Sequence, residues 1–109
     1  MKLAIVGSRN IEAFDLASVV PAGVTCIVSG GAIGIDTIAK EYAHTHDIEI
    51  IEHLPEYDKY GRTAPIIRNK KIVQDADKLL AVWDGKSRGT AFTIAHAKKV
   101  DKEVIVVKL

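Results

Sequence analysis

The sequence predicts an α/β fold built on a parallel sheet of five strands. Short continuous apolar runs alternate with stretches whose apolar residues recur at helical spacing, and glycine-bearing loops separate many of them. Apolar runs without polar alternation are typical of strands that are buried on both faces, as in parallel sheets. The alternation of strand and helix therefore predicts one sheet with helices on both sides.

The expected strands cover residues 3–6, 24–28, 48–53, 78–83 and 104–107. Helices are expected between them, weakly over 11–20, then over 35–43, from an N-cap at Thr63 to residue 74, and over 90–99. The first strong helix carries apolar residues at i, i+3, i+4, i+7 and i+8. The last is expected to carry Ala91, Ile94 and Ala95 on one face.

The length and composition fit a single globular domain over residues 1–109. Hydrophobic residues make up 48% and charged residues 27%, which disfavours disorder. The net charge of +1 lacks the basic excess that is usual for non-specific DNA binding. The lone Cys26 is expected in the core and excludes an intramolecular disulfide. Without a signal peptide or a membrane-length apolar run, a cytoplasmic location is expected.

Right-handed crossovers favour the strand order 3-2-1-4-5, a Rossmann-like domain of three layers. Ligands bind such sheets at the carboxyl ends of the strands, where the strand order reverses. That point is expected between the first and fourth strands. The loops 7–10, 29–34, 54–61 and 84–90 meet at this edge.

Two of these loops combine glycine with groups that suit a phosphate. In the first loop, Gly7 permits a sharp turn, Ser8 supplies a hydroxyl and Arg9 supplies a planar guanidinium that can donate to phosphate. An ordinary turn with a surface arginine would have the same pattern. The second loop places glycines at a helix N-terminus, where backbone N–H groups attract anions. Its candidate residues are Ser29, Gly30, Gly31, Ala32, Gly34 and Asp36. Asp36 either favours the helix dipole or accepts a hydrogen bond from a ribose hydroxyl.

The third and fourth candidates lie on a helix and on the loop after the fourth strand. Arg62, Arg68 and Asn69 either face the cleft or belong to a solvated face with the neighbouring lysines. In the loop after the fourth strand, the tryptophan ring can stack on a base or close the core. The Gly-Thr pair in this loop offers backbone N–H groups and a hydroxyl to a phosphate. These residues are Trp83, Asp84, Gly85, Ser87, Gly89 and Thr90.

Two further groups of side chains have weaker functional signals. Tyr57 and Tyr60 either cover a base or pack their own loop. The four histidines fall in different elements without metal-ligand spacing, so no metal site is expected. No Ser-His-Asp arrangement and no catalytic carboxylate pair can be argued.

Taken together, these motifs resemble the SLOG superfamily, which includes the DprA/Smf proteins and the LOG enzymes. The pattern is most similar to the compact YspA-like, DUF2493-like branch, and it covers residues 4 to about 107. The resemblance implies a Rossmann-like fold that binds nucleotides or their derivatives. LOG enzymes cleave nucleoside monophosphates with an arginine and a glutamate. Arg68 matches that arginine, which makes it a candidate catalytic residue, but the glutamate position falls on Thr93, which has no carboxylate.

Three functions follow from these patterns. The leading expectation is a binding or sensor module for a nucleotide or nucleotide-derived phosphate ligand, with no further cofactor required. The alternative is a phosphoribohydrolase that cleaves an N-glycosidic bond, which a carboxylate such as Asp36 or Asp84 beside Arg68 would favour. A DprA-like DNA-binding module is the second alternative and needs a basic stripe of lysines. A homodimer is expected, since this is the commonest soluble assembly.

Overall fold

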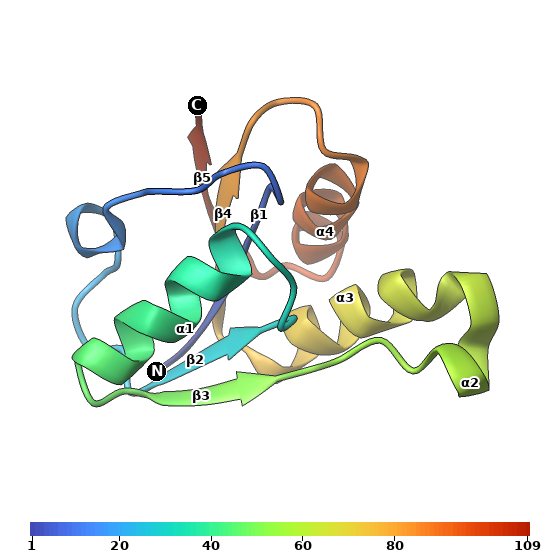
Figure 1. The fold of residues 1–109 in the computed structure, drawn as a ribbon, viewed down its shortest axis with the longest axis horizontal. Coiled ribbons are helices and arrows are strands. Elements are labelled where there is room, and N and C mark those ends of the chain that lie inside the picture. Colours follow the sequence, from blue (N-terminus) through green and yellow to red (C-terminus); the bar gives the residue numbers. More distant parts are fainter.

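The computed structural model describes all residues 1–109 and shows one five-stranded parallel sheet in the order β3-β2-β1-β4-β5 (Figure 1). The strands are β1 (Lys2–Gly7), β2 (Cys26–Ser29), β3 (Glu49–Glu52), β4 (Lys78–Trp83) and β5 (Glu103–Lys108). The predicted fold class and strand order are therefore confirmed. The order reverses at β1, which pairs with β2 on one side and with β4 on the other.

The chain has four helices, which are α1 (Ile35–Thr45), α2 (Tyr57–Tyr60), α3 (Ala64–Asp75) and α4 (Arg88–Lys99). Three of them, α1, α3 and α4, cover the two faces of the sheet (Figure 1). Helix α1 packs on one face through Ile35, Ala39 and Ala43. Helices α3 and α4 pack on the other face through residues that include Ile72 and Ile94. None of the helices is long and apolar enough to cross a membrane.

The predicted helix over residues 11–20 is wrong. Only a 3-10 turn forms, at Leu16–Ser18, and the rest of the connection between β1 and β2 is irregular. Ile11 and Leu16 still enter the same core cluster as α1. Their spacing of five residues does not place both on one helical face, and the β-branched Val19 and Val20 disfavour helix before Pro21. The first crossover is therefore not helical.

The structure also corrects three local predictions. Helix α2 and a 3-10 turn at Gly61–Thr63 occupy part of the segment expected to be a loop. The Thr63 side chain does not cap α3, because its Oγ1 donates to the Tyr60 carbonyl at 2.8 Å instead. Helix α4 begins at Arg88, before the predicted start, and buries Thr90, Thr93, Ile94 and Ala97. Ala95 is exposed, because the buried stripe follows Thr93 and Ala97 around the helix.

Candidate ligand cleft

A cleft of about 420 Å³ opens at the carboxyl ends of the strands, where β1 lies between β2 and β4. Its sixteen lining residues come from β1 and the loop after it, the β2–α1 loop, the starts of α1 and α4, helix α3, and the β4–α4 loop. The volume lies within the ~300–1,000 Å³ that is usual for small-molecule sites. Its position is the one that the strand order predicts for a ligand.

The end of β1 and the loop after it line the cleft. Gly7 is required there, because a Cβ at this position would lie 2.6 Å from Cγ1 of Ile35. The Ser8 hydroxyl is buried and accepts a hydrogen bond from the Asp84 N–H at 3.0 Å. This bond ties the β1 and β4 loops together across the point where the strand order reverses. Arg9, which follows, is exposed and lines the cleft.

Arg68 of α3 is held in place by two hydrogen bonds. Its Nη1 donates to the Gly30 carbonyl at 2.8 Å, and its Nε donates to Oδ1 of Asn69 at 2.8 Å. The residue is only 9% exposed and lines the cleft. Burial lowers the pKa of Arg68, and the nearby charge of Asp36 acts against this shift. A guanidinium has five N–H groups, so Arg68 keeps donors for a ligand.

Asp36 is a buried carboxyl in the first turn of α1 that lies next to Arg68. Its Oδ2 accepts a hydrogen bond from the Ala32 N–H at 3.1 Å. Burial raises the pKa of Asp36, while the Ala32 N–H and the charge of Arg68 act to lower it. A Cβ on Gly30 would lie 2.7 Å from Nη1 of Arg68 and 3.0 Å from Oδ2 of Asp36. Gly30 therefore lets the two charged groups approach the same stretch of backbone.

The β4–α4 loop presents the N-terminus of a helix to the cleft. Oδ1 of Asp84 accepts from the N–H groups of Lys86 and Ser87, both at 2.8 Å, and these bonds lower the pKa of Asp84. Ser87 caps α4 by accepting from the Thr90 N–H at 3.4 Å. The first N–H groups of a helix have no partner within it, so the start of α4 offers donors to an anion.

Most of the predicted site residues line this cleft. Those that do are Gly7, Ser8, Arg9, Ala32, Asp36, Arg68, Asn69, Asp84, Ser87, Gly89 and Thr90. Those that do not line it are Ser29, Gly30, Gly31, Gly34, Arg62, Trp83 and Gly85.

Trp83 and Gly34 lie outside the lining and have a structural role. The Trp83 indole N–H donates to the Ser87 carbonyl at 3.0 Å, so this side chain supports the loop. Gly34 has φ of +79°, and a Cβ there would lie 2.6 Å from Cα of Arg9. The Ser29 hydroxyl is buried without a hydrogen-bond partner. Arg62 is exposed on the 3-10 turn before α3.

Sequence reasoning missed five lining residues, which are Val6, Asn10, Pro65, Ile72 and Thr93. Asn10 follows Arg9 directly, and Thr93 lies one helical turn after Thr90, so both had a local signal. Thr93 is buried, and its Oγ1 donates to the Gly89 carbonyl at 2.8 Å. Thr93 therefore brings no carboxylate to the cleft, and its hydroxyl is already engaged.

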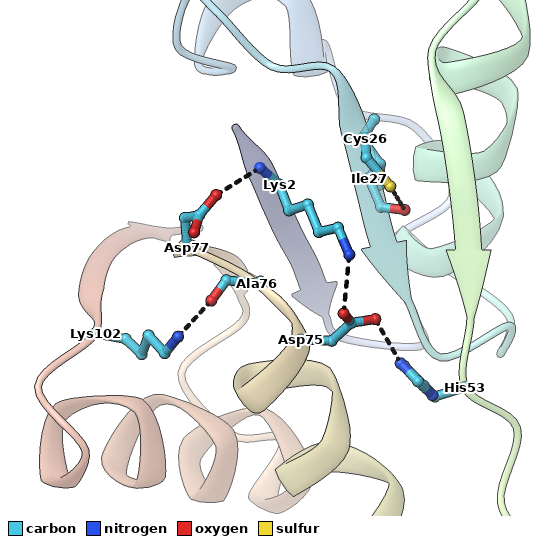
Figure 2. Close-up of polar contacts among 8 residues, drawn as sticks. All are labelled: Lys2, Cys26, Ile27, His53, Asp75, Ala76, Asp77 and Lys102. Atoms are coloured by element: carbon cyan, nitrogen blue, oxygen red, sulfur yellow. Dashed lines mark hydrogen bonds and ion pairs between the residues drawn. The ribbon is translucent and has the colours of Figure 1, made fainter.

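A second polar cluster lies outside the cleft. Figure 2 shows Asp75 between Lys2 and His53, with Oδ1 3.2 Å from Nζ of Lys2 and Oδ2 3.0 Å from Nε2 of His53. The lysines that a DNA-binding stripe would need are partly engaged elsewhere. Lys71 pairs with Glu56 at 3.0 Å, and Lys102 donates to the Ala76 carbonyl at 2.7 Å.

The fold and the cleft define a Rossmann-like α/β protein with a polar, arginine-bearing cleft at the point where the strand order reverses. No protein-family model, no curated protein and no solved structure gave a significant match to this chain.

Proposed function

We propose that the protein is a binding or sensor module for a nucleotide or a nucleotide-derived phosphate. The observation that carries this proposal is the convergence of Arg9, Arg68 and the start of α4 on one cleft. The guanidinium group of arginine and the N–H groups of a helix N-terminus both bind phosphate oxygens. Ten of the sixteen lining residues have polar or charged side chains, which suits a phosphate and a sugar. The resemblance of the loop motifs to the SLOG superfamily supports the same ligand class.

The two carboxylates of the cleft are compatible with an anionic ligand. Oδ1 of Asp84 is already used by two backbone N–H groups of its own loop. Asp36 accepts from one backbone N–H and lies beside Arg68, and its carboxylate can accept hydrogen bonds from ribose hydroxyls. The phosphate is therefore expected near Arg9 and α4, and the sugar near Asp36 and Asn69.

The test is a thermal-shift assay with AMP, ATP, GMP, NAD, ADP-ribose and cyclic nucleotides. A ligand at 100 times its Kd should stabilise the protein by about 2.7 kcal/mol. Arg9→Ala should weaken the shift, because it removes an exposed cation from the cleft. Arg62→Ala is the matched control, since it removes an exposed arginine that does not line the cleft. If no nucleotide shifts the melting temperature, or if both variants respond alike, the proposal is wrong.

A second candidate function is hydrolysis of the N-glycosidic bond of the bound nucleotide. The observation in its favour is that Asp36, a carboxyl whose pKa is raised by burial, lies beside Arg68 in the cleft. A carboxyl with a raised pKa is suited to proton transfer near neutral pH. Chromatography of the incubated nucleotide for free base tests this candidate, with Asp36→Asn as the inactive control. Bound nucleotide without released base would exclude hydrolysis of the nucleotides tested and leave the binding function.

A further inference from the structure

The side-chain amide of Asn69 is fixed in one orientation. Asn69 lies on α3 directly after Arg68, and both residues line the cleft. The Nε–H of Arg68 donates to the Asn69 side chain at 2.8 Å. Because a guanidinium only donates hydrogen bonds, the amide atom that meets this N–H is the oxygen Oδ1. The amide nitrogen Nδ2 is therefore turned away from Arg68.

The Nδ2 atom of Asn69 lies next to the start of α4. A Cβ placed on Gly89, the second residue of α4, would lie 4.0 Å from this nitrogen. Nδ2 makes no hydrogen bond within the protein, although Asn69 is half-buried. Helices α3 and α4 pack on the same face of the sheet, and this packing brings the free amide N–H groups of one helix to the first turn of the other.

The backbone at the start of α4 offers further donors at the same place. The N–H of Thr90 is taken by the Ser87 side chain, and the N–H of Ala91 donates to the Ser87 carbonyl at 3.1 Å. The N–H groups of Arg88 and Gly89 come before these two and have no acceptor within the helix. Gly89 itself lines the cleft. Side-chain and backbone N–H groups therefore face the same end of the cleft.

The acceptors around this end of the cleft are already engaged. The Ser87 carbonyl accepts from the Trp83 indole N–H at 3.0 Å as well as from the N–H of Ala91. The Gly89 carbonyl accepts from Oγ1 of Thr93 at 2.8 Å. A ligand group placed here meets free donors and engaged acceptors, which favours oxygens that only accept. A phosphate group has such oxygens, and its negative charge strengthens the hydrogen bonds that it accepts.

We propose that Asn69 determines the specificity of the cleft for phosphorylated ligands, by donating from Nδ2 to a phosphate group held at the start of α4. This inference rests on the proposed function and makes it more specific. Asn69 lies beside the expected sugar, and the phosphate of a nucleotide is esterified to that sugar. The cleft should therefore select a phosphomonoester, such as a nucleoside monophosphate or ribose 5-phosphate, over the nucleoside with a free hydroxyl.

The experiment compares phosphorylated probes with a nucleoside that lacks the phosphate. Calorimetric titration with AMP, ribose 5-phosphate and adenosine is performed on the wild type and on variants of Asn69. Asn69→Ala removes the donor and should weaken binding of AMP and ribose 5-phosphate about tenfold. Asn69→Asp keeps the shape and still accepts from Arg68, but its carboxylate faces the phosphate, so its loss should be larger. Neither variant should weaken the binding of adenosine.

Gln74→Glu is the matched control for Asn69→Asp. It makes the same change from amide to carboxylate on the same helix, at an exposed residue that does not line the cleft. Gln74→Glu should bind every probe as the wild type does. A loss as large as that of Asn69→Asp would mean that any added negative charge on α3 weakens binding, and it would overturn the role of Asn69.

Nuclear magnetic resonance of the wild type tests the contact directly and does not depend on the folding of an Asn69 variant. The chain has only three side-chain amides, those of Asn10, Asn69 and Gln74. Their signals are assigned by elimination with Asn10→Asp and Gln74→Glu. Inorganic phosphate, which has no sugar, should shift the Nδ2 signals of Asn69 and leave the amide signals of Gln74 unchanged.

The outcomes separate this inference from the proposed function. Wild-type affinity of Asn69→Ala for AMP and ribose 5-phosphate would overturn the role of Asn69 and leave the proposed function. An equal loss of AMP and adenosine, or an Asn69 signal that does not move when phosphate or AMP binds, would have the same meaning. If neither phosphorylated probe binds and no nucleotide of the thermal-shift panel stabilises the protein, the proposed function is overturned as well.

Discussion

The Nη1 atom of Arg68 donates a hydrogen bond to the carbonyl oxygen of Gly30 at 2.8 Å and so joins α3 to the β2–α1 loop. The two residues are 38 positions apart in the chain. Arg68 therefore has a structural contact as well as free N–H groups for a ligand. Its replacement is expected to affect stability as well as binding.

Arg68→Ala should lower the free energy of unfolding by about 2–3 kcal/mol, because hydrogen bonds from a charged group are stronger than neutral ones and the buried Asp36 would lose its nearby cation. Urea unfolding followed by circular dichroism measures this change. Arg62→Ala should stay within about 0.5 kcal/mol of the wild type, since its side chain is exposed. Equal stability of the two variants would show that the contact with Gly30 contributes nothing to folding.

Asp36 should make the protein less stable as the pH rises through its own titration. Its pKa in the folded protein is raised above the usual value of about 3.9 by burial. Between these two pKa values the folded state binds more protons than the unfolded state, so stability falls with increasing pH. Below the unfolded pKa, both states are protonated and the penalty is absent.

The measurement is the difference in unfolding free energy between the wild type and Asp36→Asn at a series of pH values from about 3 to 7. The unfolding free energy of the wild type should fall relative to that of the variant as the pH rises above about 4. Taking the difference removes the contributions of the other carboxyls, several of which shift in the opposite direction. A difference that does not change with pH would contradict a raised pKa for Asp36.

Asp75 should have the opposite pH dependence. Hydrogen bonds from His53 and Lys2 lower its pKa, so its carboxylate stabilises the fold above the unfolded value of about 3.9 (Figure 2). This stability is lost as the pH falls through the lowered pKa of the folded protein. Asp75→Asn should therefore melt at a lower temperature than the wild type at pH 6, and the gap should close in strong acid. Asp58→Asn, an exposed aspartate, should show no such gap.

Gly7→Ala should be far more harmful than Gly23→Ala. The new methyl at position 7 would lie 2.6 Å from Cγ1 of Ile35 and close to the Val82 carbonyl, so the core must shift. Overpacking of this kind costs about 1–3 kcal/mol or more. Gly23 has open space around it, and its φ of +85° leaves only backbone strain of about 1 kcal/mol. Chemical denaturation compares the two, and a similar cost for both would contradict the close packing at Gly7.

Ser87→Ala should destabilise the protein by about 1 kcal/mol, because the side chain caps the N-terminus of α4. Thr63→Ala should cost less than about 0.5 kcal/mol, since the exposed Thr63 makes no cap for α3. Thermal unfolding of both variants tests the distinction. A larger loss for Thr63→Ala would mean that this residue caps the helix as the sequence suggested.

The fold was predictable because its signals are local. The apolar run at 78–83 coincides with β4, and the helical spacing from Ile35 to Ala43 identifies the buried face of α1. The alternation of these elements, with right-handed crossovers, favours this strand order, and the strand order predicts where a ligand cleft opens. Most of the residues chosen from the loops at that edge do line the cleft.

The failures occurred where the local signal was weak or where two nearby partners competed. Residues 11–20 do not form an α-helix. Ile11 and Leu16 nevertheless pack in the core, although the backbone of this segment is mostly irregular. Thr63 resembles an N-cap in the sequence, yet its hydroxyl finds a nearer partner in the Tyr60 carbonyl. Periodicity and capping preferences describe one segment at a time, and they do not say which competing partner is closer.

The sequence by itself determined the α/β class, the strand order and the edge of the sheet where ligand-facing loops collect. Only the tertiary structure decided that Arg68 reaches Gly30, that Asp36 is buried beside it, and that Trp83 and Arg62 lie outside the cleft. These outcomes depend on contacts between segments far apart in the chain. Their geometry is set by how helices pack on the completed sheet, which no local pattern of residues specifies.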